Sequence, residues 1–121
     1  MKESELNELV KRIKLSDQLA FKTLFDFFEE AIFRFLLFKT KDATVAEDLL
    51  QEVFLKLWKV RATLDERRSI KNFLYTIADN ISLNHIRHLK VVAAYQNHNQ
   101  PSSKLFSVVE NPHYILEEKE W

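Results

Sequence analysis

Residues 48–58 read DLLQEVFLKLW, and this segment places side chains on two opposite stripes of one helix. The core stripe has three- and four-residue steps and consists of Ala46, Leu49, Leu50, Val53 and Leu57. The opposite stripe consists of Asp48, Gln51, Glu52, Leu55 and Trp58. An outward helical edge usually carries Lys and Glu, so Leu55 and Trp58 among acidic and amide residues predict a protein-docking surface. The alternative is that Trp58 covers the open end of a small helical bundle.

The start of this helix is marked by a predicted capping motif. Residues 44–47 read TVAE, which has the form of a capping box. In this motif the Thr44 hydroxyl accepts a hydrogen bond from the backbone N–H three residues on, and Glu47 reaches back to the Thr44 backbone. The helix is therefore predicted to begin at Thr44 and to end near Val60.

Three further helices are predicted around this one. Apolar residues at helical spacing place them over about residues 4–15, residues 17–38 and residues 69–92, with Ser16 or Asp17 as the N-cap of the second. The chain has no Gly and only two Pro residues, whereas β-hairpins draw heavily on Gly. We therefore predict an all-α fold, a compact bundle of about four helices with a C-terminal linker tail.

The predicted helix over residues 69–92 has an unusual polar side. Its members lie four residues apart and end beside Arg87 and His88; they are Asn72, Thr76, Asn80 and Asn84. Each Asn costs a helix roughly half a kcal/mol relative to Ala, so a purely solvated face would use Glu, Lys or Gln. Amides and hydroxyls suit base edges and sugar–phosphate oxygens, and Tyr75 offers a stacking surface for an unpaired base. The line indicates nucleic-acid binding, and an ordinary amphipathic helix of unusual composition is the alternative.

The net charge and the absence of catalytic motifs exclude several classes of function. The formal net charge is zero, which argues against a generic nucleic-acid binder, although residues 61–90 hold six basic and three acidic side chains. His85 and His88 have the spacing of metal ligands but lack a carboxylate or Cys on their face, so we expect no metal. The chain has no Gly-rich phosphate loop and no Ser–His–Asp order. We therefore expect no cofactor and no enzymatic activity.

The remaining composition indicates location and domain organisation. The chain has no Cys, begins with a polar and acidic segment, and has its longest apolar stretch at residues 31–38, too short for a membrane span. These features predict a soluble, cytoplasmic protein. Residues 1–92 are predicted to form one helical domain. Residues 93–121 are predicted to hold a linker, from the composition of residues 96–103, and the start of a truncated second domain, from the Asn–Pro helix start at residues 111–112.

Two motifs follow one another in this chain. Residues 48–58 fit the pattern D-x-x-Q-[ED]-x-F-x-[KR]-x-[WFY], and residues 73–87, FLYTIADNISLNHIR, fit [FW]-L-x-x-I-A-x-N-x-x-x-[DN]-x-x-R. With AFKTLF at residues 20–25, the match covers about residues 16–90. In these residues the chain resembles the region 2 domain of extracytoplasmic-function (ECF) sigma factors of bacterial RNA polymerase.

The resemblance implies a transcription initiation factor that docks on the RNA polymerase core and recognises and melts the promoter −10 element. The implied contacts with the clamp helices of the polymerase β′ subunit are Asp48, Gln51, Glu52, Leu55 and Trp58. The implied contacts with the single-stranded −10 non-template strand are Asn80, Lys71, Tyr75, Thr76, Asn84, Arg87, Arg67 and Arg68. One base would be flipped into a pocket walled by the loop at residues 61–68. An anti-sigma factor is a further expected partner.

Two departures from the family pattern qualify this expectation. The family often has Arg or Lys where this chain has Thr76 and Asp79, so the Asp79 carboxylate is expected to point away from DNA or to pair with a base such as Arg87 or His85. The family's second domain, which reads the promoter −35 element, is missing, so we expect the chain to be a fragment. The alternative function is a helical protein-interaction module, an adaptor or anti-sigma-bound regulator without DNA binding of its own.

Overall fold

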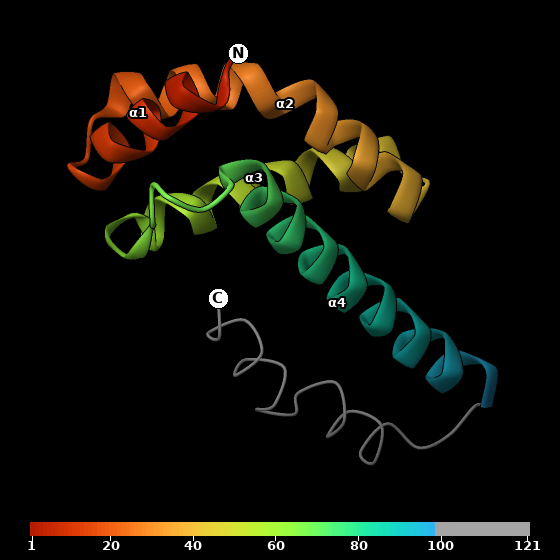
Figure 1. Cartoon of the computed structure of the whole chain (residues 1–121). Helices are drawn as coiled ribbons and strands as arrows, with labels where there is room; N and C mark the ends of the chain where they lie inside the picture. The colour runs from red at the N-terminus through yellow and green to blue at the C-terminus, as the bar shows by residue number, and fades with distance from the viewer. Residues whose placement is uncertain (99–121) are drawn as a thin grey trace. The chain divides into compact units, whose positions relative to one another are not determined.

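The computed structural model describes residues 1–98 and consists of α-helices and one short 3-10 helix over that range (Figure 1). The elements are α1 (Glu3–Lys14), α2 (Gln18–Thr40), α3 (Ala43–Lys59), η1 (Arg61–Thr63) and α4 (Ile70–His98). The all-α prediction and the order of the predicted helices are confirmed. Residues 1–82 form one compact unit, and the described residues 83–98 belong to a second. α4 begins in the first unit and continues into the second.

The core of the first unit is built from one face of each helix. α1 packs against α2, and α2 packs against α3 (Figure 1). The buried side chains of α2 and α3 are Ala20, Leu24, Phe28, Ile32, Leu36, Ala46, Leu49, Leu50, Val53, Phe54 and Leu57. Those of α1 and the first part of α4 include Leu6, Val10, Ile13, Ile70, Leu74, Ile77 and Ala78. Burial of this apolar surface is the main force that holds the helices together. The predicted core stripe of residues 46–57 is confirmed.

Two turns of this Gly-free chain use a left-handed backbone at ordinary residues. Ser16, between α1 and α2, has φ 67°, and Lys41, between α2 and α3, has φ 57°. At Lys41 the backbone N–H donates to the Leu37 carbonyl oxygen at 2.7 Å and so ends α2. A residue with a Cβ is disfavoured in this region, which is why Gly is the usual choice at the end of a helix.

Lys41→Gly is expected to raise the free energy of unfolding by about 0.5–1 kcal/mol. The reason is that Gly relieves a left-handed backbone cost of about 1–2 kcal/mol but has more freedom in the unfolded chain. Urea denaturation measures the change. Lys11→Gly, inside α1, is the matched control and should lower the free energy of unfolding by about 0.5–1 kcal/mol. A loss of stability in both variants would contradict the strained turn.

The N-cap of α3 differs from the prediction. The Asp42 carboxylate accepts hydrogen bonds from the backbone N–H groups of Thr44, at 3.0 Å, and Val45, at 3.2 Å. Thr44 therefore lies inside the first turn, and the capping box predicted from Thr44 and Glu47 is wrong. The carboxylate satisfies two N–H groups that have no partner within the helix, and its charge lies at the positive end of the helix dipole. The predicted cap of α2 is confirmed, because Asp17 accepts from two backbone N–H groups there.

Asp42→Ala is expected to lower the free energy of unfolding by about 1 kcal/mol, because it removes the side chain that caps α3. Thr44→Ala is the matched control and should change stability little, since the capping acceptor is not Thr44. Chemical denaturation of the two variants measures both effects. The larger loss in Thr44→Ala would restore the capping box and contradict the Asp42 cap.

The limits of α4 also differ from the prediction. The helix starts as expected, because the Asn72 backbone N–H donates to the Ser69 hydroxyl oxygen at 3.2 Å. It continues to His98, so the predicted end near Val92 was too early, and residues 96–98, assigned by composition to a linker, are helical. The rest of the predicted linker and the predicted helix start at residues 111–112 lie outside the described residues. Among residues 1–98, no helix is both long and apolar enough to cross a membrane.

Candidate functional site

The outer stripe of α3 is exposed along most of its length. Asp48, Gln51 and Glu52 are exposed, and the Leu55 side chain among them is 60% exposed. A large apolar side chain surrounded by carboxylates and an amide lies on a face that does not pack against the core. Such a side chain gains free energy only when a partner covers it. Leu55 is therefore the apolar centre of this stripe.

Trp58, the last member of the stripe, has only part of its side chain exposed to a partner protein. Its ring meets the Phe21 ring edge-on, with centroids 5.1 Å apart, and the Arg61 guanidinium carbon lies 4.1 Å from the Trp58 ring centroid. Arg61 also donates a hydrogen bond to the Trp58 carbonyl oxygen at 2.7 Å. Trp58 is thus half-buried between α2 and the start of the following loop. This packing matches the alternative in which Trp58 covers the end of the bundle.

The polar line on α4 consists of Asn72, Thr76, Asn80 and Asn84, and its members in the first unit face outward. Lys71, Asn72, Thr76 and Asn80 are all exposed. The Thr76 hydroxyl donates to the Asn72 carbonyl oxygen at 2.8 Å, so the Thr76 oxygen atom remains able to accept a further hydrogen bond. Asn84 and Arg87 follow along α4 within the second unit. Amide, hydroxyl and ammonium groups therefore follow each other on one exposed side of this helix.

Tyr75 lies beside this line but is held by the core. It is half-buried, and its ring meets the Phe35 ring of α2 edge-on at 5.2 Å between centroids. The Lys39 ammonium lies 5.4 Å from the centroid of the same Phe35 ring. The Tyr75 ring is therefore anchored in one orientation, with only part of its surface open to a ligand.

The Asp79 carboxylate has a partner that the sequence did not reveal. It lies 3.2 Å from the Lys39 ammonium of α2. The sequence predicted that Asp79 points away from DNA or pairs with a base such as Arg87 or His85, and the structure pairs it with Lys39 of another helix. Because Lys39 offsets the negative charge, Asp79 repels a phosphate less than an isolated carboxylate would.

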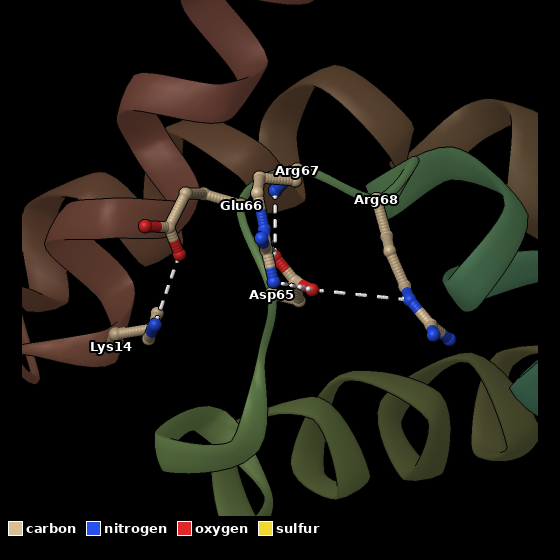
Figure 2. A network of polar contacts seen from close by, with 5 residues as sticks. All are labelled: Lys14, Asp65, Glu66, Arg67 and Arg68. Atoms are coloured by element: carbon tan, nitrogen blue, oxygen red, sulfur yellow. Dashed lines mark hydrogen bonds and ion pairs between the residues drawn. The ribbon is translucent and has the colours of Figure 1, made fainter.

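The loop between α3 and α4 is organised by two carboxylates (Figure 2). Asp65 accepts from the Arg67 guanidinium at 3.1 and 3.3 Å, and the Arg68 guanidinium lies 3.9 Å from it. Hydrogen bonds from the Arg67 side chain and then its backbone hold the pKa of Asp65 below its usual value. Glu66 lies 3.0 Å from the Lys14 ammonium of α1. Its own backbone N–H, and then Lys14, lower the pKa of Glu66. Both carboxylates are ionised at neutral pH, and their ion pairs weaken when acid protonates them.

A cavity of about 300 Å³ opens beside this loop. It is lined by Val10, Thr63, Leu64, Asp65, Arg68, Ser69, Ile70 and Phe73. Half of these residues are polar and come from the loop, and the apolar remainder comes mainly from α1 and the start of α4. A mixed lining of this kind suits a flat ligand with an apolar face and a polar edge. The resemblance implies a pocket walled by this loop, whereas helical spacing marks Val10 only as a core residue and gives no sign that it lines a cavity.

A metal ion would need several ligating side chains that lie close together in the structure. Among residues 1–98, no group of three or more His, Asp or Glu side chains lies close enough to hold a metal ion. His85 and His88 are therefore not joined there by a third such ligand.

The fold and these surfaces define a small all-α domain with an exposed apolar side chain on one helix and an exposed polar side on another. Residues 24–91, more than half of the chain, match the family model described as Sigma-70 region 2. The chain belongs to the sigma-70 region 2 family. Sigma factors are non-enzymatic, so family membership accounts for the expected lack of catalytic activity.

Curated relatives place the similarity in ECF sigma factors. The chain is 28% identical to SigW of Bacillus subtilis over 88 residues, which cover 73% of this chain and 47% of SigW. It is 33% identical to SigX of the same organism over 67 residues, or 55% of this chain and 34% of SigX. For SigM of B. subtilis the identity is 31% over 98 residues, or 80% of this chain and 58% of SigM. The matched region thus spans between about a third and three fifths of these relatives.

A solved structure has the same fold. It is the NMR structure of an engineered region 2 of sigmaE in complex with GTAAAA, with a TM-score of 0.65 and 23% sequence identity. The likeness covers 79% of this chain and 93% of the solved chain. The arrangement of helices is therefore that of a sigma factor region 2.

Proposed function

We propose that this chain acts as the region 2 domain of an ECF-type sigma factor, which docks on core RNA polymerase and then recognises and melts the −10 promoter element. The observation that carries the proposal is the exposure of Leu55 within residues 48–58, the motif to which the resemblance assigns polymerase docking. An exposed apolar side chain on an acidic and amide-rich helix edge is a typical anchor for a protein partner. The docking surface consists of Asp48, Gln51, Glu52, Leu55 and the exposed part of Trp58.

The −10 strand would lie along α4. Asn80 is the leading contact with a base edge or the backbone, because its amide can both donate and accept. Further contacts come from Lys71, Tyr75, Thr76, Asn84 and Arg87. The amides read base edges, while the cationic groups attract phosphates. Exposure of the polar line from Lys71 to Asn80 supports this assignment.

The cavity beside the loop would accept one base that is flipped out of the strand. Extruding a base costs a few kcal/mol, which contacts in the pocket must offset. Phe73 and Ile70 provide apolar surface, and Asp65 and Ser69 provide polar groups for the edge of the base. Arg68 lines the cavity and Arg67 precedes it in the loop; 88% of each side chain is exposed, so both can reach phosphates.

Docking and DNA binding would depend on each other. A chain of zero net charge gains little from counterion release and should bind DNA weakly alone. Polymerase supplies the missing attraction and holds the strand against α4. We further propose that residues 1–92 are the domain that docks on polymerase and reads DNA, and that residues 93–121 lead into a second domain. We also propose that an anti-sigma factor covers the docking stripe when the protein is inactive.

Capture of purified polymerase tests the docking step. The immobilised chain should retain core RNA polymerase of B. subtilis, the organism of several relatives, and release it when free SigW is added as a competitor for the same site. Retention that SigW does not reduce, or no retention, would contradict docking. In the latter case the protein-interaction module without DNA binding would become the better account.

A further inference from the structure

The C-terminal end of α1 and the turn that follows it are joined to the loop of residues 61–69 by two side-chain contacts. The Lys14 ammonium lies 3.0 Å from the Glu66 carboxylate, and each side chain is only 33% exposed (Figure 2). The Arg61 guanidinium donates a hydrogen bond to the Ser16 hydroxyl oxygen at 2.8 Å. Both contacts connect positions more than forty residues apart in the sequence. They therefore fix the loop to an element that the chain order does not bring near it.

These two contacts lie on either side of three loop residues that line the cavity. Thr63, Leu64 and Asp65 lie between Arg61 and Glu66, and all three line the cavity. Val10, one turn before Lys14 on α1, lines it as well. α1 thus lines the cavity through Val10, and Lys14 and Ser16 contact the loop on both sides of residues 63–65.

The backbone of the α1–α2 turn makes this anchor rigid. Ser16 has φ 67°, and its backbone N–H donates to the Ile13 carbonyl oxygen at 2.8 Å. The next N–H, of Asp17, donates to the Arg12 carbonyl oxygen at 3.1 Å. The backbone that carries the Ser16 side chain is therefore held in place, and the Ser16 hydroxyl accepts from Arg61 at the start of the loop.

We propose that Lys14 and Ser16 are positioning residues for the base pocket. They do not contact DNA, but hold residues 63–65 in the geometry that accepts a flipped base before DNA arrives. A preformed pocket loses less conformational freedom when it binds, and this raises the affinity for the base. The proposal rests on the proposed function, in which the cavity takes one base of the −10 strand.

A charge-reversal cycle tests the role of Lys14. The full chain is bound to core polymerase, and its affinity is measured by fluorescence anisotropy for a single-stranded −10 oligonucleotide selected from a randomised pool. Abasic sites are then placed at each position of this oligonucleotide in turn. The second probe is the one whose abasic site weakens wild-type binding most. Lys14→Glu and Glu66→Lys should each weaken binding of the intact probe about threefold to fivefold, the scale of one partly exposed ion pair. The double variant should regain most of that loss.

The abasic probe and a matched variant separate positioning from general charge effects. Neither single variant should weaken binding of the abasic probe further, because no base then occupies the pocket. Lys22→Glu makes the same charge change on α2, where Lys22 is exposed and pairs with Asp26 at 3.0 Å. It should leave both probes unaffected, whereas repulsion of phosphates would weaken both.

The free protein provides a second measurement. Lys14→Glu should speed amide hydrogen exchange at residues 63–68 while the helix cores stay protected. Unchanged exchange, an equal loss of affinity for intact and abasic probes, or no recovery in the double variant would overturn the positioning role. If the wild-type complex binds no −10 strand, or shows no abasic-sensitive position, the base pocket itself is wrong and the proposed function fails with it.

Discussion

Leu55→Arg is expected to weaken binding to core RNA polymerase at least about thirtyfold, the scale of a hot-spot residue. The Leu55 side chain is 60% exposed, so its replacement removes little core packing. In the complex, however, the new cation would replace the apolar centre of the docking stripe and would lose its water there, which is costly. Biolayer interferometry with purified core polymerase measures the affinity, and thermal unfolding checks that the fold is kept.

Leu89→Arg is the matched control for this prediction. Leu89 lies on α4 outside the docking stripe and is 53% exposed. The same substitution there should leave polymerase affinity within about twofold of wild type, as is usual for residues outside a hot spot. Equal affinity of Leu55→Arg and the wild-type chain would contradict the docking stripe.

Trp58 is a poorer probe of docking than its sequence position indicates. The aromatic ring packs on Phe21 and under the Arg61 guanidinium. Truncation to Ala would remove these contacts and leave a gap at the end of the bundle. A loss of polymerase binding in that variant would mix folding with docking, whereas Leu55 separates the two.

Asn80→Ala is expected to change stability and DNA binding in opposite directions. Asn80 is an exposed residue inside α4, and Ala is the better helix former by roughly half a kcal/mol, so the free energy of unfolding should rise slightly. The affinity of the polymerase-bound chain for the single-stranded −10 element should fall about tenfold, since one base or backbone contact is worth about 1–3 kcal/mol. Urea denaturation and anisotropy with a labelled strand measure the two effects.

A damaged fold cannot produce this result, because it would lower both the free energy of unfolding and the affinity for DNA. Thr23→Ala removes an exposed polar side chain from α2 and serves as the control, with no expected change in DNA affinity. Unchanged binding by Asn80→Ala would remove the leading DNA contact from the account. Parallel losses of stability and affinity would indicate damage to the fold.

The helices and their buried faces could be predicted because both depend on local pattern. Apolar residues at three- and four-residue steps mark the side of a helix that must leave water, whatever that side packs against. The stripe from Ala46 to Leu57 is buried for this reason. The cap of α3 was missed because Asp42 and Thr44 both fit an N-cap pattern, and only the fold shows which side chain reaches two N–H groups.

The contacts between residues far apart in the chain could not be predicted from the sequence. Periodicity gives the face on which Asp79 lies, but not that Lys39 of another helix lies opposite it. The same holds for Lys14 and Glu66, which are 52 residues apart. Such pairs depend on how the helices pack, so the loop was predicted as a polar connection while its attachment to α1 was not.

The central claim, that the chain reads the −10 strand when polymerase holds it there, is tested most directly by one binding measurement. Single-stranded oligonucleotides with a randomised central segment are incubated with the chain alone, with core polymerase alone, and with both. The account predicts that a −10-like sequence is enriched only by the chain and polymerase together, and that Leu55→Arg and Asn80→Ala each abolish most of the enrichment. Equal enrichment by polymerase alone, or by the chain without polymerase, would contradict it.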